Sequence, residues 1–251
     1  MLTFVIICPL LFLAGFVDAV AGGGGLISLP AYMLAGLSPH HAIATNKLSS
    51  SMGTTVATIQ YIKAGFVKWR VCLPAIVGAL VGSWLGAKIS LFLDENVLKI
   101  MMLVVLPFIA FYVFRTKSLE RSDSGDGYSL KMTIALCVVI SLIVGVYDGL
   151  YGPGTGTFLM LLFTGLAHLT LQDAAGATKA INLTTNITAL AVFLVNGAVL
   201  IPLGLVAGVC NMAGNYLGSR CFFAKGASFA KPLILVVLTI FFIKIIWGFV
   251  A

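Results

Sequence analysis

The chain has 251 residues, of which 60% are hydrophobic and only 9% are charged, and its mean hydropathy is +1.11. This composition excludes an ordinary water-soluble domain, a disordered tail and a nucleic-acid-binding module, because charged residues are too sparse to cover a solvated surface. The net charge of +7 is typical of a membrane protein whose excess Lys and Arg lies in cytoplasmic loops, so it does not require an acidic partner. We therefore expect an all-α polytopic membrane protein whose surroundings are the lipid bilayer.

The first apolar stretch could be a secretory signal peptide or a membrane helix. Ala19-Val20-Ala21 before Gly22 resembles the small-residue cleavage site of a signal peptide. However, no Lys or Arg precedes the apolar run, and the pattern around Asp18 recurs in mid-chain, where it cannot be a signal. We interpret this stretch as the first membrane segment.

Ten apolar segments follow one another along the chain. They cover residues 2–20, 26–37, 41–62, 71–93 and 97–114 in the first half, and 131–151, 157–169, 173–195, 202–223 and 229–249 in the second. Residues 1–114 and 131–251 thus form two membrane units, joined by the polar linker 115–130. The second segment of each unit, about 12 residues long, would span roughly 18 Å, whereas a bilayer core is about 30 Å thick. We expect both to be half-helices that follow glycine-rich breaks at residues 22–25 and 152–156.

The two units repeat the same pattern. Asp18 and Asp148 lie 130 positions apart (148 − 18), and each has a glycine three positions before it and glycines four and six positions after it. Because each unit has five segments, the second copy enters the membrane in the opposite direction. The sequence therefore predicts two inverted repeats, a plan common in secondary transporters.

The basic residues outside the apolar segments lie mostly on one side of this arrangement. That side carries Lys63, Lys68, Arg70, Arg115, Lys117, Arg121, Lys131, Arg220, Lys225 and Lys231, whereas the other side carries Lys88, Lys99 and Lys244. By the positive-inside rule, the linker is predicted to be cytoplasmic and both termini outside, in a multi-pass protein of the plasma (inner) membrane.

Four charged residues lie deep in apolar segments, namely Asp18, Lys47, Asp148 and Lys179. A charge inside the membrane is costly, so it is either paired or functional. One interpretation is two structural salt bridges. The other is a binding site, which the neighbouring glycine breaks and the polar residues around both lysines favour.

A glycine break before a half-helix offers amide donors and the positive end of a helix dipole, which suits an oxyanion. The lysines would add full positive charge, and the Ser, Thr and Asn side chains would replace the lost hydration shell. The candidate substrate-binding residues are Gly23, Gly24, Thr45, Asn46, Lys47, Ser50, Gly154, Thr155, Thr178, Lys179, Asn182 and Asn186. Asp18 and Asp148 could neutralise the lysines when the site is empty, or carry a coupling proton.

Other motifs do not support an enzyme. The glycines at 152–156 lack the Gly-Lys-Ser/Thr of a nucleotide-binding loop, and the five cysteines have no C-x-x-C spacing. His40 and His41 are expected in a solvated turn, and His168 has no evident catalytic partner. We expect no catalytic residue, no metal and no cofactor.

The paired motifs resemble those of the sulfite exporter TauE/SafE family, also called the sulfonate uptake permeases. In the first unit these are Gly15 to Asp18, the glycines at 22–25, Pro30 and Ala44-Thr45-Asn46-Lys47. In the second they are Gly145 to Asp148, residues 152–156 and Ala177-Thr178-Lys179 with Asn182. The resemblance covers nearly the whole chain and implies a bacterial-type plasma-membrane transporter of small sulfur-containing or organic anions, such as sulfite, sulfonates or sulfoacetate.

The leading functional hypothesis is a secondary transporter that moves such an anion by alternating access, since the sequence has no ATP-binding motif. A proton or another ion could couple to transport. The alternatives are a passive anion channel and a membrane scaffold that transports nothing. Whether the chain forms a homo-oligomer is left open by the sequence.

Overall fold

The computed structural model describes residues 2–94, 96–97, 100, 128–225 and 232. Within these residues the chain forms eight helices and no strand, which confirms the all-α prediction. Apart from residues 97, 100 and 232, the predicted segments 97–114 and 229–249 lie outside the described residues, as does most of the predicted linker 115–130.

The helices follow the predicted apolar segments closely. They are α1 (Leu2–Ala21), α2 (Gly25–Leu34), α3 (Pro39–Lys63), α4 (Trp69–Phe92), α6 (Leu130–Leu150), α7 (Thr155–Gly165), α8 (Leu171–Val195) and α9 (Ile201–Lys225). Several of their ends carry local start signals. Pro39 occupies the first turn of α3, and the side chains of Ser129 and Thr170 accept hydrogen bonds from Met132 N and Asp173 N at the starts of α6 and α8.

One boundary differs from the prediction. His40 and His41 lie in the first turn of α3 rather than in a solvated turn, because the helix already begins at Pro39. The ring of His40 bonds to the carbonyl oxygen of Leu93 at 3.0 Å, and that of His41 to the carbonyl oxygen of Ala198 at 2.7 Å. Both histidines therefore connect α3 to neighbouring chain segments.

The second helix of each half is short, as predicted. Helix α2 has 10 residues and α7 has 11, so neither is long enough to cross a bilayer alone. The chain is interrupted between helices at residues 22–24 and 151–154, and each interruption is one residue shorter than the glycine-rich break that the sequence indicated. Gly22, Gly152 and Gly154 have φ angles of 73°, 96° and 80°, a conformation that side chains with a Cβ rarely adopt.

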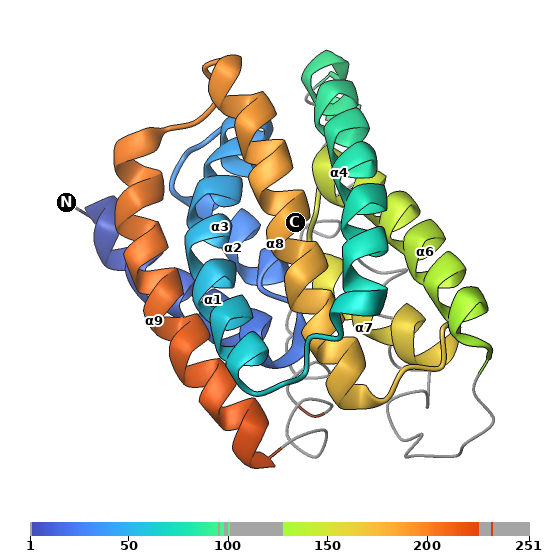
Figure 1. Cartoon of the computed structure of the whole chain (residues 1–251). Helices are drawn as coiled ribbons and strands as arrows, with labels where there is room; N and C mark the ends of the chain where they lie inside the picture. The colour runs from blue at the N-terminus through green and yellow to red at the C-terminus, as the bar shows by residue number, and fades with distance from the viewer. Residues whose placement is uncertain (1, 95, 98–99, 101–127, 226–231, 233–251) are drawn as a thin grey trace.

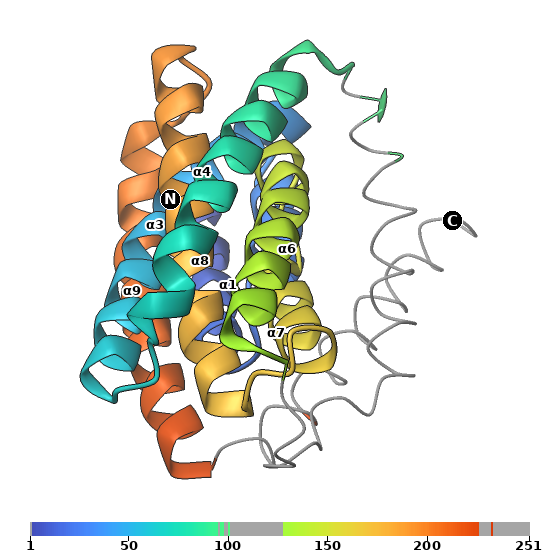
Figure 2. The same cartoon turned by 45° about the vertical axis from the view of Figure 1, so that its right-hand side comes forward.

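The helices pack in two close pairs. Helix α1 lies against α9 at one side of the bundle and α4 lies against α6 at the other, while α3 and α8 contact each other between them (Figures 1 and 2). Small residues permit this closeness. A Cβ atom on Gly82 would lie 2.2 Å from the carbonyl oxygen of Leu142, and one on Gly214 would lie 2.0 Å from that of Phe12.

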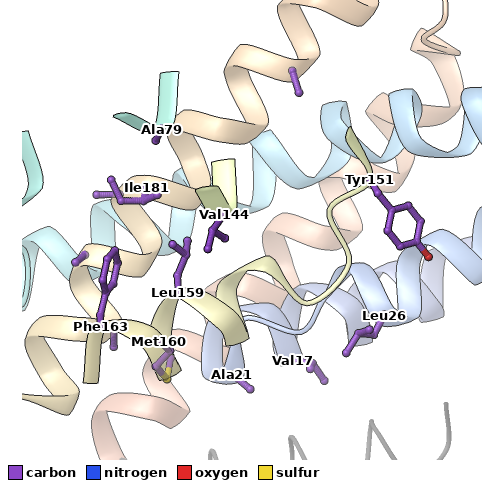
Figure 3. Packing of buried hydrophobic residues seen from close by; sticks show 14 of the residues in the cluster. Val17, Ala21, Leu26, Ala79, Val144, Tyr151, Leu159, Met160, Phe163 and Ile181 are labelled. Atoms are coloured by element: carbon purple, nitrogen blue, oxygen red, sulfur yellow. The ribbon is translucent and has the colours of Figure 1, made fainter. Parts of the chain in front are cut away.

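The bundle is apolar outside and contains many polar side chains inside. Helices α4, α6 and α8 are each long and apolar enough to cross a membrane. Helix α3 also has 25 residues, but it buries a row of polar side chains, namely Thr45, Asn46, Lys47, Ser49, Ser51, Thr54 and Thr58. Leu159 and Phe163 of α7 pack toward Val144 and Ile181 in the apolar core (Figure 3).

Candidate functional site

The two glycine breaks touch each other near the centre of the described bundle. The backbone N–H of Thr157 donates to the carbonyl oxygen of Gly22 at 3.2 Å, and its hydroxyl donates to that of Ala21 at 2.8 Å. A Cβ atom on Gly22 would lie 2.2 Å from the carbonyl carbon of Gly156. The interrupted segments of the two halves are therefore in direct backbone contact.

Lys47 on α3 forms a buried ion pair with Asp148 at the end of α6. The ammonium nitrogen lies 2.7 Å from Asp148 Oδ2, and both side chains are 2% exposed. Lys47 Nζ also donates to Asn186 Oδ1 at 3.2 Å, and the hydroxyl of Thr155 donates to Asp148 Oδ1 at 2.6 Å. Each charge of this pair thus has a second polar partner.

Lys179 on α8 pairs with Asp18 on α1 in the corresponding way. Its ammonium nitrogen lies 3.4 Å from Asp18 Oδ2 and also donates to the backbone carbonyl oxygen of Asp18. The Lys179 side chain is fully buried, whereas that of Asp18 is 12% exposed. Both pairs join a lysine of one half of the chain to an aspartate of the other half.

A small polar cavity lies beside these pairs. Its volume of about 20 Å³ has room for about one water molecule. It is lined by Asp18, Gly22, Gly25, Asn46, Lys47, Ser50, Asp148, Gly152, Thr155, Gly156, Asn182 and Asn186. Side chains from α1, α3, α6, α7 and α8 therefore converge on one point.

Most of the candidate residues chosen from the sequence meet at this cavity. Those that line it are Asn46, Lys47, Ser50, Thr155, Asn182 and Asn186, together with Asp18 and Asp148. Gly23, Gly24, Thr45, Gly154, Thr178 and Lys179 do not line it. Two hydrogen bonds join amide and hydroxyl groups of the lining, from Ser50 Oγ to Asn46 Oδ1 at 3.3 Å and from Asn186 Nδ2 to Asn182 Oδ1 at 3.3 Å.

The residues outside the cavity have other surroundings. The hydroxyl of Thr45 accepts a hydrogen bond from Leu200 N at 3.1 Å, just before the start of α9. Gly24 packs closely against α1, because a Cβ atom at this position would lie only 2.6 Å from Asp18 Cβ. The hydroxyl of Thr178 is buried and has no hydrogen-bond partner within the described part of the chain.

Four glycines of the cavity lining were not among the candidates, namely Gly22, Gly25, Gly152 and Gly156. All four belong to the glycine-rich breaks at residues 22–25 and 152–156, so the glycine clusters in the sequence could have identified them as lining residues. The amide donors expected at the start of α7 are partly in use. Thr155 N donates to Gly152 O at 3.3 Å, and Thr157 N donates across to Gly22 O. Side chains therefore provide much of the polar lining.

Apolar helices that enclose buried charges and a polar cavity are typical of a membrane transport protein. The family described as sulfite exporter TauE/SafE matches residues 7–245, so the chain belongs to this family. The family comprises membrane transporters, so this chain is a multi-pass membrane transporter and not an enzyme.

Relatives in several bacteria support this assignment. The chain is 38% identical to the "probable membrane transporter protein ORF9" of Sinorhizobium sp over 90% of this chain and 85% of the relative. It is 34% identical to the "probable membrane transporter protein YfcA" of Escherichia coli strain K12 over 94% and 86% of the two chains. A "probable membrane transporter protein" of Haemophilus influenzae is 31% identical over 90% and 87%. No solved structure matches the chain.

Proposed function

We propose that the protein is a secondary transporter that moves a small sulfur-containing or organic anion, of the sulfite, sulfonate or sulfoacetate type, across the plasma membrane by alternating access. The observation that carries this proposal is the position of Lys47. Its ammonium group lies in a polar cavity at the crossing of two broken helices, where a positive charge in a low dielectric suits an anion.

The proposed architecture is two inverted repeats, residues 1–114 and 131–251, joined by a cytoplasmic linker at 115–130 with both termini outside. The packing pattern supports a two-fold relation. The first helix of each half packs on the fourth helix of the other, as α1 on α9 and α6 on α4, and the lysines of the two third helices pair with the aspartates of the two first helices. Rocking of one repeat against the other would expose the cavity to each side in turn.

In the proposed site Lys47 and Lys179 bind the negative charge. The hydrogen-bond donors are the polar side chains that line the cavity, namely Asn46, Ser50, Thr155, Asn182 and Asn186. The other candidates, namely Thr45, Thr178 and the backbone groups of Gly23, Gly24 and Gly154, would join the site only after the helices move. A cavity with room for about one water molecule cannot hold an oxyanion with several non-hydrogen atoms. Substrate entry therefore requires the Lys47–Asp148 pair to part or the surrounding helices to move.

The anion-channel and scaffold hypotheses make different predictions. A carrier shows counterflow, in which unlabelled anion on one side accelerates uptake of labelled anion from the other, whereas a passive channel does not. A scaffold moves no anion in liposomes. The cavity favours a carrier, since an ion pair and polar side chains line it and it has room for only about one water molecule.

The decisive test is flux by the purified full-length protein in liposomes, with sulfite, sulfoacetate, sulfate, an alkanesulfonate and the zwitterion taurine compared. We expect Lys47→Met and Lys179→Met to abolish flux and counterflow at unchanged protein levels. Lys68→Met is the matched control, because Lys68 is an exposed lysine whose ion pair with Asp173 lies away from the cavity, and it should transport normally. Normal flux in both of the first two variants contradicts the site assignment.

A further inference from the structure

The charges at the cavity sum to zero when all four ionisable groups are charged. Lys47 and Lys179 contribute two positive charges, and Asp18 and Asp148 contribute two negative charges. A bound anion would leave an uncompensated negative charge in a buried site, which is costly because ion–ion energies are several-fold larger there than in water. One proton taken up with a monovalent anion would keep the loaded site neutral.

The two aspartates are not equally suited to accept that proton. Asp148 is held on both carboxylate oxygens, by Lys47 Nζ at 2.7 Å and by the hydroxyl of Thr155 at 2.6 Å, and is 2% exposed. Asp18 lines the same cavity and its side chain is 12% exposed. Within the described residues, its carboxylate accepts one long hydrogen bond, from Lys179 Nζ at 3.4 Å. Lys179 would keep its bond to the backbone oxygen of Asp18 after protonation of the carboxyl group.

The charged and titratable groups around Asp18 are few. Lys179 of α8 is in contact with it, and Lys47 of α3 and Asp148 of α6 share its cavity. The hydroxyl of Tyr61 on α3 donates to the neighbouring carbonyl oxygen of Ala19 at 2.9 Å. Helices α2 and α7 carry no charged residue or histidine within their bounds, and Arg220 of α9 is turned onto the ring of Tyr216. Lys179 is the basic side chain that forms an ion pair with Asp18 in the described part of the chain.

We propose that Asp18 is the coupling carboxylate of this transporter, which takes up one proton for each anion bound, while Asp148 stays ionised and anchors Lys47. This inference rests on the proposed anion transport and specifies its coupling ion. On loading, a proton from water bonds to a carboxylate oxygen of Asp18 as the anion enters. Both leave together on the other side, and the site returns with Asp18 ionised and all charges paired.

This assignment separates two variants that would otherwise look equivalent. Asp18→Asn imitates the protonated carboxyl group, so its site carries one positive charge when empty and is neutral with a monovalent anion. Asp148→Asn removes the anchor of Lys47 instead. The first change should uncouple anion movement from protons, whereas the second should remove anion binding itself.

The experiment uses full-length protein in liposomes that contain a pH-sensitive dye, with the membrane potential clamped. A labelled alkanesulfonate with no second acidic group is the first probe, because its single negative charge does not change in the assay range. Sulfite exchanges protons with water in that range, and sulfoacetate carries two negative charges. We expect about one proton per anion for the wild-type protein. A pH difference of one unit should then drive about tenfold accumulation, because one pH unit corresponds to about 1.4 kcal/mol.

For Asp18→Asn we expect the proton-to-anion ratio to fall close to zero, the pH-driven accumulation to disappear, and counterflow to persist without its pH dependence. Asp18→Glu, which retains a carboxylic acid, should keep a ratio near one, and Asp148→Asn should lose counterflow. If Asp18→Asn does not accumulate in the membrane, Asp18→Ser provides the same comparison.

The inference is overturned if the wild-type protein moves the alkanesulfonate without protons, or if Asp18→Asn retains the wild-type proton-to-anion ratio. It is also overturned if Asp148→Asn lowers the proton-to-anion ratio close to zero and keeps counterflow, since Asp148 would then carry the proton. These results leave anion transport itself intact. By contrast, absence of flux of every compound compared contradicts the proposed function, and with it the coupling.

Discussion

The two ion pairs of the site occupy corresponding places in the two halves, yet they differ in how firmly they are held. Lys47–Asp148 measures 2.7 Å and has two further polar partners, whereas Lys179–Asp18 measures 3.4 Å and relies on a backbone oxygen. The hydrogen-bond partners of the two carboxylates explain the difference. Thr155 corresponds to Gly25 at the offset of the aspartates (155 − 130), so the carboxylate of Asp18 has no equivalent hydroxyl beside it.

The hydrogen-bond partners of the two lysines differ as well, and again only the Lys47–Asp148 pair has a further side-chain partner within the described residues. Asn186 corresponds to Thr54 at the offset of the lysines, since 179 − 47 and 186 − 54 are both 132. Asn186 accepts a bond from Lys47, but the hydroxyl of Thr54 bonds to the carbonyl oxygen of Ser50 on its own helix at 2.6 Å. The four charges thus lie at corresponding positions of the two halves, while the side chains around them differ. Lys47–Asp148 is an anchored pair, whereas Lys179–Asp18 has a loosely held carboxylate.

The largest expected effect comes from breaking the anchored pair. Asp148→Ala leaves the Lys47 ammonium group buried without its counter-charge, which should lower the free energy of unfolding by about 3–5 kcal/mol. Asp18→Ala should cost clearly less, because Lys179 keeps its bond to the backbone oxygen of residue 18. Thermal unfolding of both variants in the same detergent measures the difference.

A double variant provides the control for this prediction. Lys47→Met combined with Asp148→Leu removes both charges, so it should recover much of the stability lost in Asp148→Ala while transporting no anion. Equal losses for Asp148→Ala and Asp18→Ala would show that the two pairs contribute alike, contrary to the geometry.

The sequence located the charges but not their partners. Each glycine break, each deep lysine and the short helices α2 and α7 follow from local patterns, namely apolar run lengths and glycine clusters. The pairing of Lys47 with Asp148, 101 positions away, depends on how the two halves pack, and no local pattern specifies it. Likewise Thr45 looked like a site donor, because its position beside Lys47 gave no sign that Leu200 would occupy its hydroxyl.

The next effect concerns the glycine that touches the anchored pair. A Cβ atom on Gly152 would lie 2.8 Å from Asp148 Oδ1 and 2.9 Å from Lys47 Nζ, and φ at this position is 96°. Gly152→Ala should therefore combine backbone strain of about 1–2 kcal/mol with displacement of the ion pair. We expect anion counterflow to fall more than protein stability does, measured in the same preparation.

Gly36→Ala is the matched control for that change. Gly36 has a φ of 91°, yet a Cβ atom there meets nothing within 4 Å. It should show the strain alone, with transport per folded molecule unaffected. If Gly152→Ala and Gly36→Ala behave alike in transport, the close approach of the glycine to the ion pair has no functional role.

A smaller effect is expected from the hydroxyl that distinguishes the two pairs. Thr155→Val keeps the shape of the side chain but removes the bond to Asp148 Oδ1, which should cost about 1–3 kcal/mol because a buried carboxylate oxygen loses its donor. The variant makes the anchored pair resemble the Asp18 pair, so its proton-to-anion ratio should rise above that of the wild type if Asp148 begins to accept protons.

Thr184→Val is a suitable comparison for this variant, because Thr184 bonds to the carbonyl oxygen of Ala180 on its own helix at 2.8 Å. Such a change should leave the ratio and the pH dependence of transport as they are. An unchanged ratio in Thr155→Val would mean that Lys47 alone keeps Asp148 ionised.

The smallest effect on stability is expected at the exposed ion pair of Lys68 and Asp173. This pair tests whether the contribution of the two central ion pairs to stability depends on their burial. Lys68 Nζ lies 3.6 Å from Asp173 Oδ1, with the two side chains 57% and 24% exposed. Water and salt screen such a pair, so Lys68→Met should change stability by less than about 1 kcal/mol. Unfolding temperatures at low and high salt provide the measurement. A loss as large as that of Asp148→Ala would mean that this peripheral contact holds the two halves together. A negligible loss of stability in Lys68→Met would mean that strong charge pairing between the halves is confined to the two buried ion pairs beside the glycine breaks.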